Sequence, residues 1–491
     1  MKFPEQFVKE TRPVNRRGLR LIHWLAGKVL AALLVPALCG AWPAFAAGPC
    51  TVTSNLDNGG AGQLRTLIAD DTCGSINFQA GLPSPIVLNG TQLEIGRDLT
   101  INGPGAANLA ISGNHASQIF EIDPGVTVAI SGLTIENGLA KAGGGIHNEG
   151  ALTLTNITVS GNTSAGGVGG GINNYGGTLT LTNSTVSGNT SAGSYGGGIA
   201  NGAATLILTN STVSGNTSSN SDGGGIGNQG IATVTNSTVS GNTAWGNGGG
   251  IANGSGFTGG GTVTLINSTV SGNTSGSGGA GIQNTSGGTL NVKNTIVANN
   301  KLAGGTVENC GGTGSSLGYN LSDDASCAFF TATGDLTNTP ANLGPLQNNG
   351  GLTETLALLV GSAAIDHVPL AVCTDTDGTP ISTDQRGVAR PQGPACDIGA
   401  FELTAADAIP NLVTQVLKLN IKTGISNSLD AKLNAALGAL DDINTHNDGA
   451  AVNALQAFIN AVQAQSGGQI DEADADALIN AAQQIIDALR G

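Results

Sequence analysis

The chain of 491 residues is poor in aromatic and in charged side chains. Aromatic residues make up 3% of it and charged residues 10%, whereas an ordinary soluble domain has about 25% charged residues. This composition indicates that something other than a conventional core is being built. Hydrophobic residues still amount to 39% and recur at regular intervals, which excludes an intrinsically disordered chain.

Basic residues are scarce, and their absence limits the partners. The chain has 18 Lys and Arg against 33 Asp and Glu, and seven of the basic and two of the acidic residues lie in residues 1–46. The 11 basic and 31 acidic residues that remain give residues 47–491 a formal charge of −20. No Lys or Arg lies between Lys141 and Lys293. Binding to phosphates needs clustered Lys and Arg, so nucleic acid and anionic membranes are excluded as partners.

Long apolar runs are missing after residue 46, so the sequence predicts no transmembrane span in the mature chain. Before that point, residues 1–28 are basic and residues 29–38 are apolar. Ala44 and Ala46 then supply the small side chains of a cleavage site. Residues 1–46 are therefore predicted to be a signal peptide, and the protein is predicted to be secreted, either extracellular or at the cell surface.

Cysteines are few, and Cys39 lies within the predicted signal peptide. The other six fall into three local couples: Cys50 and Cys73, Cys310 and Cys327, and Cys373 and Cys396. An even number of cysteines in an exported chain predicts disulfides, and the long repeat region after the first couple favours local pairing. No Cys-x-x-Cys or paired-His spacing accompanies them, so no metal and no cofactor is predicted.

What the sequence has in abundance is glycine, 79 residues of it, and a repeat. The phrase NSTVSGNTS or a close variant recurs at steps of 27, 27, 26, 31 and 27 residues, and it begins at Asn156, Asn183, Asn210, Asn236, Asn267 and Asn294. A second phrase, GGGI or GAGI followed by x-Asn, precedes each copy. A repeat of this length indicates a solenoid or a propeller.

Apolar residues alternate with Thr before each of these asparagines, as in Leu152 and Leu154, which is typical of a strand with one buried face. The next apolar residue, such as Val159, comes at an odd spacing after the Asn, which indicates a corner. One repeat is too small to bury a core alone, but stacked copies bury continuous apolar columns. We therefore predict a mainly β protein, a right-handed parallel β-helix with three short strands per coil, about nine coils and ladders of Asn side chains.

Two further segments have their own composition. Residues 47–75 are predicted to cap the first coil and residues 336–402 to close the last, with the β-helix repeats spanning residues 76–335. In residues 406–491, apolar side chains recur at helical spacing in four stretches separated by breaks, which predicts a small C-terminal all-α bundle of four helices.

Three resemblances follow from these motifs. The repeat phrases resemble those of polymorphic outer membrane proteins, and the helical tail resembles the FIMAH domain of secreted bacterial proteins. Residues 343–366 and 383–402 are similar to the C-terminal block of the choice-of-anchor Q family of β-helix proteins. The residues that carry this last similarity are Gly344, Pro345, Asn349, Gly350, Gly351, Ser362, Ala364, Ile365, Asp366, Asp384, Arg386, Gly387, Arg390, Pro391, Cys396, Asp397, Gly399 and Glu402. The resemblances imply an exported surface protein whose tail serves attachment or interaction.

Residues suited to catalysis are scarce in the repeats, where Glu149 and Asp222 are the only charged side chains from Gly143 to Val292. Lysis or hydrolysis of polysaccharides on a β-helix needs a carboxylate cluster, so the repeats are predicted to be non-catalytic. His147 is interpreted as a variable, exposed position.

The aromatic side chains of the Gly-rich stretches, Tyr175, Tyr195 and Trp245, are candidates for stacking on sugars. The sequence thus favours an adhesin-like or structural binding module of a surface or matrix, with a glycan or a host or matrix surface protein as its partner.

Two alternatives stay open. One is a polysaccharide lyase or glycoside hydrolase whose site lies outside the repeats, near Asp366, Asp384 and Arg386. These side chains should converge on an open cleft if they are catalytic and be buried in ion pairs if they are structural. The other is a rod that acts only as a spacer presenting the helical tail.

Overall fold

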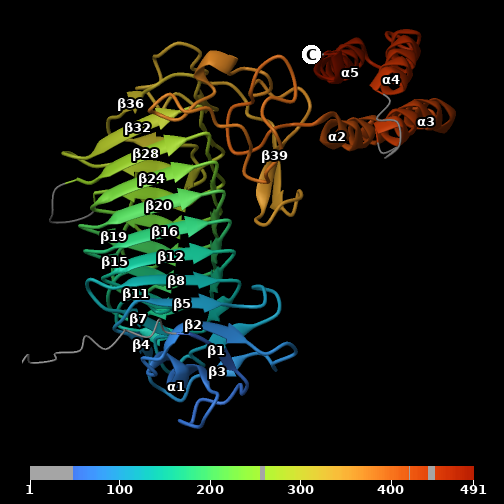
Figure 1. The fold of residues 1–491 in the computed structure, drawn as a ribbon. Coiled ribbons are helices and arrows are strands. Elements are labelled where there is room, and N and C mark those ends of the chain that lie inside the picture. Colours follow the sequence, from blue (N-terminus) through green and yellow to red (C-terminus); the bar gives the residue numbers. More distant parts are fainter. Residues whose placement is uncertain (1–47, 255–259, 420, 441–447, 491) are drawn as a thin grey trace, which may run out of the picture. The chain divides into compact units, whose positions relative to one another are not determined.

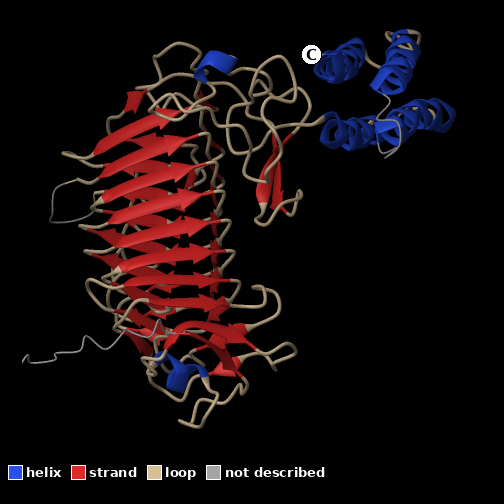
Figure 2. Cartoon of the chain, in the orientation of Figure 1, coloured by secondary structure: helices blue, strands red, loops and turns tan. Residues whose placement is uncertain are grey.

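Short strands stack into four parallel sheets in the computed structural model, which describes residues 48–254, 260–419, 421–440 and 448–490 (Figures 1 and 2). The predicted signal peptide, residues 1–46, lies outside the described residues. We name the sheets A to D.

In hydrogen-bonded order, sheet A consists of β1 (Gly48–Val52), β2 (Cys73–Phe78), β5 (Leu99–Asn102), β8 (Thr127–Ser131), β12 (Ala151–Thr155), β16 (Thr178–Thr182), β20 (Thr205–Thr209), β24 (Ile231–Thr235), β28 (Thr262–Ile266), β32 (Thr289–Lys293) and β36 (Ser315–Ser316). Sheet B consists of β3 (Ile86–Val87), β6 (Ala110–Ser112), β9 (Thr134–Glu136), β13 (Thr158–Ser160), β17 (Thr185–Ser187), β21 (Thr212–Ser214), β25 (Thr238–Ser240), β29 (Thr269–Ser271), β33 (Ile296–Ala298) and β37 (Leu321–Ser322).

Sheet C consists of β4 (Leu93–Ile95), β7 (Phe120–Ile122), β11 (Ile146–Asn148), β15 (Ile172–Tyr175), β19 (Ile199–Gly202), β23 (Ile226–Asn228), β27 (Ile251–Asn253), β31 (Ile282–Asn284) and β35 (Cys310–Gly311). Sheet D consists of β10 (Leu139–Ala140), β14 (Thr163–Ser164), β18 (Thr190–Ser191), β22 (Thr217–Ser218), β26 (Thr243–Ala244), β30 (Thr274–Ser275) and β34 (Lys301–Leu302).

Each repeat forms one coil, which passes through sheets C, A, B and D in that order. Equivalent residues of successive coils pair in register, so that Leu152 lies opposite Leu179 and Leu154 opposite Leu181. The inward columns of Leu, Val and Ile that result are fully buried, and Leu154, Val159 and Ile146 are each 0% exposed. The chain is therefore a mainly β protein with a parallel β-helix, as predicted.

The repeated asparagines make the corners and the ladders. The Asn between sheets A and B has a left-handed backbone in each repeat, with φ between 45° and 54° at Asn156, Asn183, Asn210, Asn236, Asn267 and Asn294. Asn tolerates this conformation better than most residues, and the predicted corner is confirmed. In sheet C, the side-chain nitrogens of Asn148, Asn174, Asn201, Asn228 and Asn253 each donate to the side-chain oxygen of the next Asn, at 2.7 to 2.8 Å.

A second ladder of Asn side chains explains why each coil has four strands, one in each sheet, and not the predicted three. The Asn of the phrase SGNT, which reads ANNK in the last copy, turns inward and is fully buried. It bonds to its equivalent in the next coil, from Asn162 through Asn189, Asn216, Asn242 and Asn273 to Asn300. The two residues after it then pair as the short strands of sheet D. A strand of two residues has no alternating pattern to reveal it in the sequence.

The ends of the stack differ in part from the prediction. Residues 48–52 form β1, which pairs in parallel with β2, so the stack already begins within the segment expected to be only a cap. The helix α1 (Leu64–Ile68) follows and buries Leu64 and Ile68.

Disulfides join Cys50 to Cys73, Cys310 to Cys327 and Cys373 to Cys396, which are the three predicted couples.

After the last coil, β38 (Leu343–Gln347) and β39 (Thr355–Leu358) form an antiparallel hairpin, and a 3-10 turn, η1, covers Leu370–Val372. The helices α2 (Ala405–Lys418), α3 (Thr423–Leu440), α4 (Asp448–Gln463) and α5 (Glu472–Arg490) follow and share an apolar core that includes Leu412, Leu433, Phe458 and Ile486. The C-terminal helical region is thus as predicted. None of the helices in the described ranges has the length and apolar character needed to cross a bilayer.

Candidate functional site

A groove follows the corner between sheets C and A. Two hollows, of about 250 and 430 Å³, lie along this corner and share Gly176, Gly177 and Thr178. Together they extend over six successive coils, from Gly125 to Thr262. Because neighbouring strands lie about 4.8 Å apart, the groove is roughly 24 Å long. The small Gly and Ala residues that follow the sheet C strands leave the corner hollow.

Two of the predicted aromatic candidates meet beside this groove. Tyr175 is the last residue of β15 and is 59% exposed, and it pairs with Gly202 of β19. A Cβ at Gly202 would lie 3.5 Å from the Tyr175 ring and 3.3 Å from the Tyr195 hydroxyl. Both tyrosine side chains therefore lie over the glycine, which has no side chain to displace them.

The side chain of Tyr195 is fixed by contacts at its ring and at its hydroxyl. Its ring lies over Gly227, where a Cβ would come within 2.5 Å of it. Its hydroxyl donates to Oε1 of Gln229, at 3.1 Å, and Gln229 itself lines the groove. Burial, and then the neighbouring Tyr175, raise the pKa of Tyr195, so its hydroxyl stays protonated at neutral pH. The pair offers one fixed ring and one exposed ring.

Trp245 is not part of this pair. It follows β26 of sheet D and is 71% exposed. Its corner is equivalent to that of Tyr195 but lies two coils further along, which is roughly 10 Å. The structure thus brings together two of the three aromatic candidates and leaves the third exposed directly after a strand of sheet D.

A cluster of carboxylates surrounds His147 at the other end of the groove. Glu94, Glu121, His147 and Asn173 occupy successive rungs of sheet C. The His147 Nε2 lies 3.5 Å from Glu149 and 3.9 Å from Glu121, and its Nδ1 lies 2.9 Å from the Asn173 amide nitrogen. An amide nitrogen only donates, so Nδ1 accepts and the proton of the neutral ring lies on Nε2, facing both carboxylates.

Burial raises the pKa of Glu121; His147 opposes this shift, while Glu149, Asp123 and Glu94 add to it. The interpretation of His147 as an exposed position is wrong, because its side chain is 19% exposed and contacts Glu121, Glu149 and Asn173. Sequence reasoning missed the cluster because Glu94 and Glu121 lie in irregular coils outside the clear repeats. Aligning the GGGI phrase before His147 with residues 93–95 and 120–122 would have placed Glu94 and Glu121 in line with His147 and so predicted the cluster.

The three residues of the alternative site do not converge on an open cleft. Asp384 is fully buried and accepts hydrogen bonds from the backbone of Arg386, Val388 and Glu402. Arg386 is 4% exposed, bonds to Asp384 at 2.9 Å and lies 3.5 Å from the centre of the Phe401 ring. This is the buried ion pair expected of a structural role.

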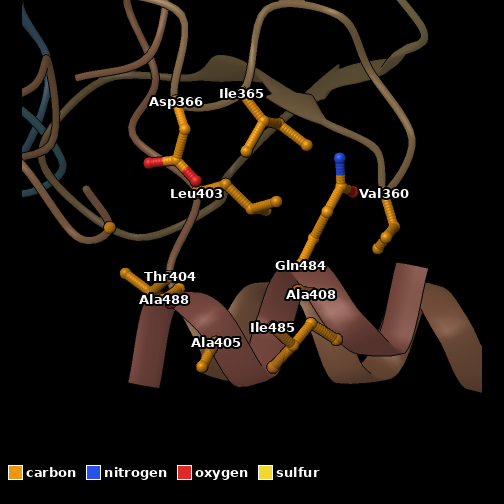
Figure 3. Close-up of a pocket in the computed structure, with 11 residues that line it drawn as sticks. Val360, Ile365, Asp366, Leu403, Thr404, Ala405, Ala408, Gln484, Ile485 and Ala488 are labelled. Atoms are coloured by element: carbon orange, nitrogen blue, oxygen red, sulfur yellow. The ribbon is translucent and has the colours of Figure 1, made fainter. Parts of the chain in front are cut away.

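Asp366 lies apart from them, at a small cavity that α5 also lines (Figure 3). The side chains around this cavity are mostly apolar, among them Val360, Ile365 and Leu403. Its volume is about 20 Å³, which is room for about one water molecule. Burial raises the pKa of Asp366. A cavity of this size does not admit a sugar ring.

Within the described residues, no group of three or more His, Cys, Asp and Glu side chains is arranged to hold a metal ion. The groove between sheets C and A is the best candidate site in the described part of the chain. It extends over six coils, the exposed ring of Tyr175 and the fixed ring of Tyr195 lie beside it, and polar side chains lie toward both of its ends.

The strand pairing defines the chain as a parallel β-helix protein with a C-terminal helical region. No family model matches the sequence, so its resemblances to the choice-of-anchor Q, polymorphic outer membrane protein and FIMAH families stay predictions. No curated protein matches it either.

Among solved structures, the crystal structure of pectate lyase Pel9A is similar, with 16% identity, 72% of this chain and 95% of that chain covered, and a TM-score of 0.37. This likeness adds nothing to what the strand pairing itself shows about the fold.

Proposed function

We propose that the protein is an exported, adhesin-like β-helix protein that binds a neutral glycan in the groove between sheets C and A. The observation that supports this most is the pair formed by Tyr175 and Tyr195 beside a groove of six coils. Sugar rings present apolar faces that stack on aromatic side chains, while their hydroxyls bond to amides and carboxylates. The groove supplies both kinds of group, with Gln229 near the tyrosines and Glu149 toward the first coils.

The charge of the groove favours a neutral polysaccharide over a polyuronate. The described residues that line it include Glu149 and no Lys or Arg, and the nearest basic residues in the sequence are Lys141 and Lys293. A chain of uronates would meet only repulsion there. Export is supported by the three disulfides, which form in oxidising compartments. We further propose that residues 406–491 attach the protein to its surface or matrix.

A glycan array of neutral, acidic and amino-sugar oligosaccharides, probed with the mature protein, tests this function. We expect binding to neutral oligosaccharides, and we expect Tyr175→Ala and Tyr195→Ala each to weaken it about tenfold, because each removes a stacking surface. Trp245→Ala is expected to have a smaller effect, since Trp245 is not part of the pair. Binding only to uronates, or equal binding by the tyrosine variants, would contradict the proposal.

The same oligosaccharides should be assayed for release of reducing ends and of unsaturated products. The enzyme alternative near Asp384 and Arg386 is not favoured, because both side chains are buried in an ion pair. If cleavage is nevertheless observed and is lost in Glu149→Gln and in Glu121→Gln, the cluster around His147 is a catalytic site and the non-catalytic assignment is wrong.

A further inference from the structure

A second groove lies on a different face, the outward face of sheet B. It has a volume of about 510 Å³ and is lined by Gly105, Ala106, Ala107, Thr134, Asn156, Ile157, Thr158, Asn183, Thr185 and Leu352. No Lys, Arg, Asp or Glu and no aromatic residue is among these. We call the groove at the corner between sheets C and A the glycan groove. Sheet A separates it from the groove on sheet B, because each coil passes from sheet C through sheet A to sheet B.

Three of the residues that line this groove, Thr134, Thr158 and Thr185, are part of a ladder of threonines on sheet B. Successive strands of sheet B place a Thr at the same outward position in six coils, at Thr134, Thr158, Thr185, Thr212, Thr238 and Thr269. Rungs lie about 4.8 Å apart. The phrase N-[IS]-T-V-S of the repeat therefore presents a row of hydroxyls, with the corner asparagines beside them.

The protein's own chain covers the later rungs of this ladder. The Thr212 hydroxyl donates to the backbone carbonyl of Glu354 at 2.6 Å. The Thr238 hydroxyl donates to the Gln385 side chain at 2.6 Å, and the Thr269 hydroxyl accepts from the backbone N–H of Ala400 at 3.0 Å. Segments after the last coil, including the hairpin that ends in β39 (Figure 1), thus bind sheet B through its threonines.

The corner asparagines take part in the same interface. The Asn236 side chain donates to the carbonyl of Thr383 at 2.8 Å, and the Thr353 hydroxyl donates to the carbonyl of Asn210 at 3.1 Å. At the opposite end of the ladder, the Thr134 hydroxyl donates to the carbonyl of Ala106 at 2.7 Å. Peptide carbonyls are therefore the acceptors for Thr134 and Thr212, the rungs that flank Thr158 and Thr185.

Thr158 and Thr185 are the two rungs between them. Both side chains are partly exposed and line the groove, and within the described part of the chain neither hydroxyl makes a hydrogen bond. From Thr134 to Thr212 the ladder measures roughly 14 Å, which about four residues of extended chain would span. Leu352 is 67% exposed at the rim and offers an apolar contact.

We propose that this groove binds an extended, uncharged peptide segment of a partner protein, whose carbonyls accept from Thr158 and Thr185. The peptide would continue the interface that the protein's own segments already make on the same ladder. The absence of charged lining residues excludes strong selection for a charged sequence. The absence of aromatic lining residues distinguishes this groove from the glycan groove and disfavours sugar rings.

The probe for the test is a synthetic, acetylated and amidated peptide with the sequence of residues 350–358 and Gln in place of Glu354. It reproduces the stretch whose carbonyl binds Thr212, without its charge. The mature protein, labelled at its Thr methyl groups, is titrated with this peptide and followed by NMR. We expect saturable shifts of the Thr158 and Thr185 methyl resonances.

The double variant Thr158→Val and Thr185→Val keeps the shape of the side chains and removes the hydroxyls. It is expected to lower the affinity for the peptide about tenfold, while Thr153→Val with Thr180→Val, on sheet A of the same coils, changes it less than about twofold. Circular dichroism confirms that both variants fold.

Absence of shifts up to millimolar peptide would overturn the proposal, as would equal affinity of the two double variants. A neutral oligosaccharide that moves the Thr158 and Thr185 resonances when the peptide does not would also overturn it and make this groove a second glycan site. The tyrosine variants leave this groove intact, so this proposal and the glycan proposal fail or hold separately.

Discussion

Replacing Asn216 with alanine is expected to lower the free energy of unfolding by about 3–5 kcal/mol. Asn216 is fully buried in the second Asn ladder. Its side-chain nitrogen donates to the Val186 carbonyl and to Asn242, each at 2.9 Å, and its side-chain oxygen accepts from the backbone and the side chain of Asn189 at 3.0 and 2.9 Å. Alanine removes all four bonds. The Asn242 oxygen still accepts from the Asn216 backbone N–H and the Asn189 side-chain nitrogen still donates to the Val159 carbonyl, so the cost comes from the partly unsatisfied buried groups, at about 1–3 kcal/mol each.

The matched control is Asn291→Ala. Asn291 lies on the outward face of β32 and is only partly buried, so we expect a change below about 0.5 kcal/mol. Urea denaturation followed by far-UV circular dichroism measures both variants. Equal stability of Asn216→Ala and the wild type would show that the ladder does not hold the coils together.

Replacing Arg390 with methionine is expected to destabilise the segment after the last coil by about 3–5 kcal/mol at neutral pH. The Arg390 side chain is 0% exposed and bonds to Glu402 at 2.7 Å and to the carbonyls of Asp397 and Gly399 at 2.9 and 2.6 Å. Methionine fills the space but leaves the buried carboxylates of Glu402 and Asp397 without a counter-charge. Arg490→Met, at an exposed position in the last turn of α5, is the control.

The loss in Arg390→Met should depend on pH. Burial raises the pKa of Glu402, which Arg390 opposes, and burial and then Glu402 raise the pKa of Asp397. A carboxyl with a raised pKa in the folded state binds its proton more tightly when folded, so protonation favours the folded state as the pH falls.

Without Arg390 these pKa values rise further. The deficit of the variant should therefore shrink as the pH falls from about 8 toward about 5, above the ordinary Glu pKa of about 4.3. Denaturation of the variant and the wild type at both pH values measures this. A deficit that is constant or that grows toward low pH would show that Arg390 acts through packing alone.

The stack was predictable because its chemistry is local and repeated. The alternation of Leu152 and Leu154 before Asn156 specifies one buried face and one corner, and the same phrase in each coil forces equivalent residues into register. The helical tail was predictable for a similar reason, because apolar residues that recur at helical spacing indicate an amphipathic helix. Tyr175 and Tyr195 were recognisable as candidates by residue type.

What the sequence did not reveal depends on contacts between coils and on segments without a period. Sheet D has strands of two residues, such as Thr190–Ser191, which carry no alternation. The meeting of Tyr175 and Tyr195 depends on Gly202 and Gly227 in neighbouring coils. The cluster of Glu121 with His147 depends on the register between an irregular coil and the first regular one. The burial of Asp384 and Arg386 depends on the path of a segment without repeats.

Glycan binding between sheets C and A is tested most directly by a calorimetric titration of the mature protein with the neutral oligosaccharide that it binds best on the array. We expect saturable binding by the wild type, an unchanged affinity in the double variant Thr158→Val and Thr185→Val, and a loss of about a hundredfold in the double variant Tyr175→Ala and Tyr195→Ala. Binding that survives the loss of both tyrosines would contradict the claim that the groove between sheets C and A is the glycan site.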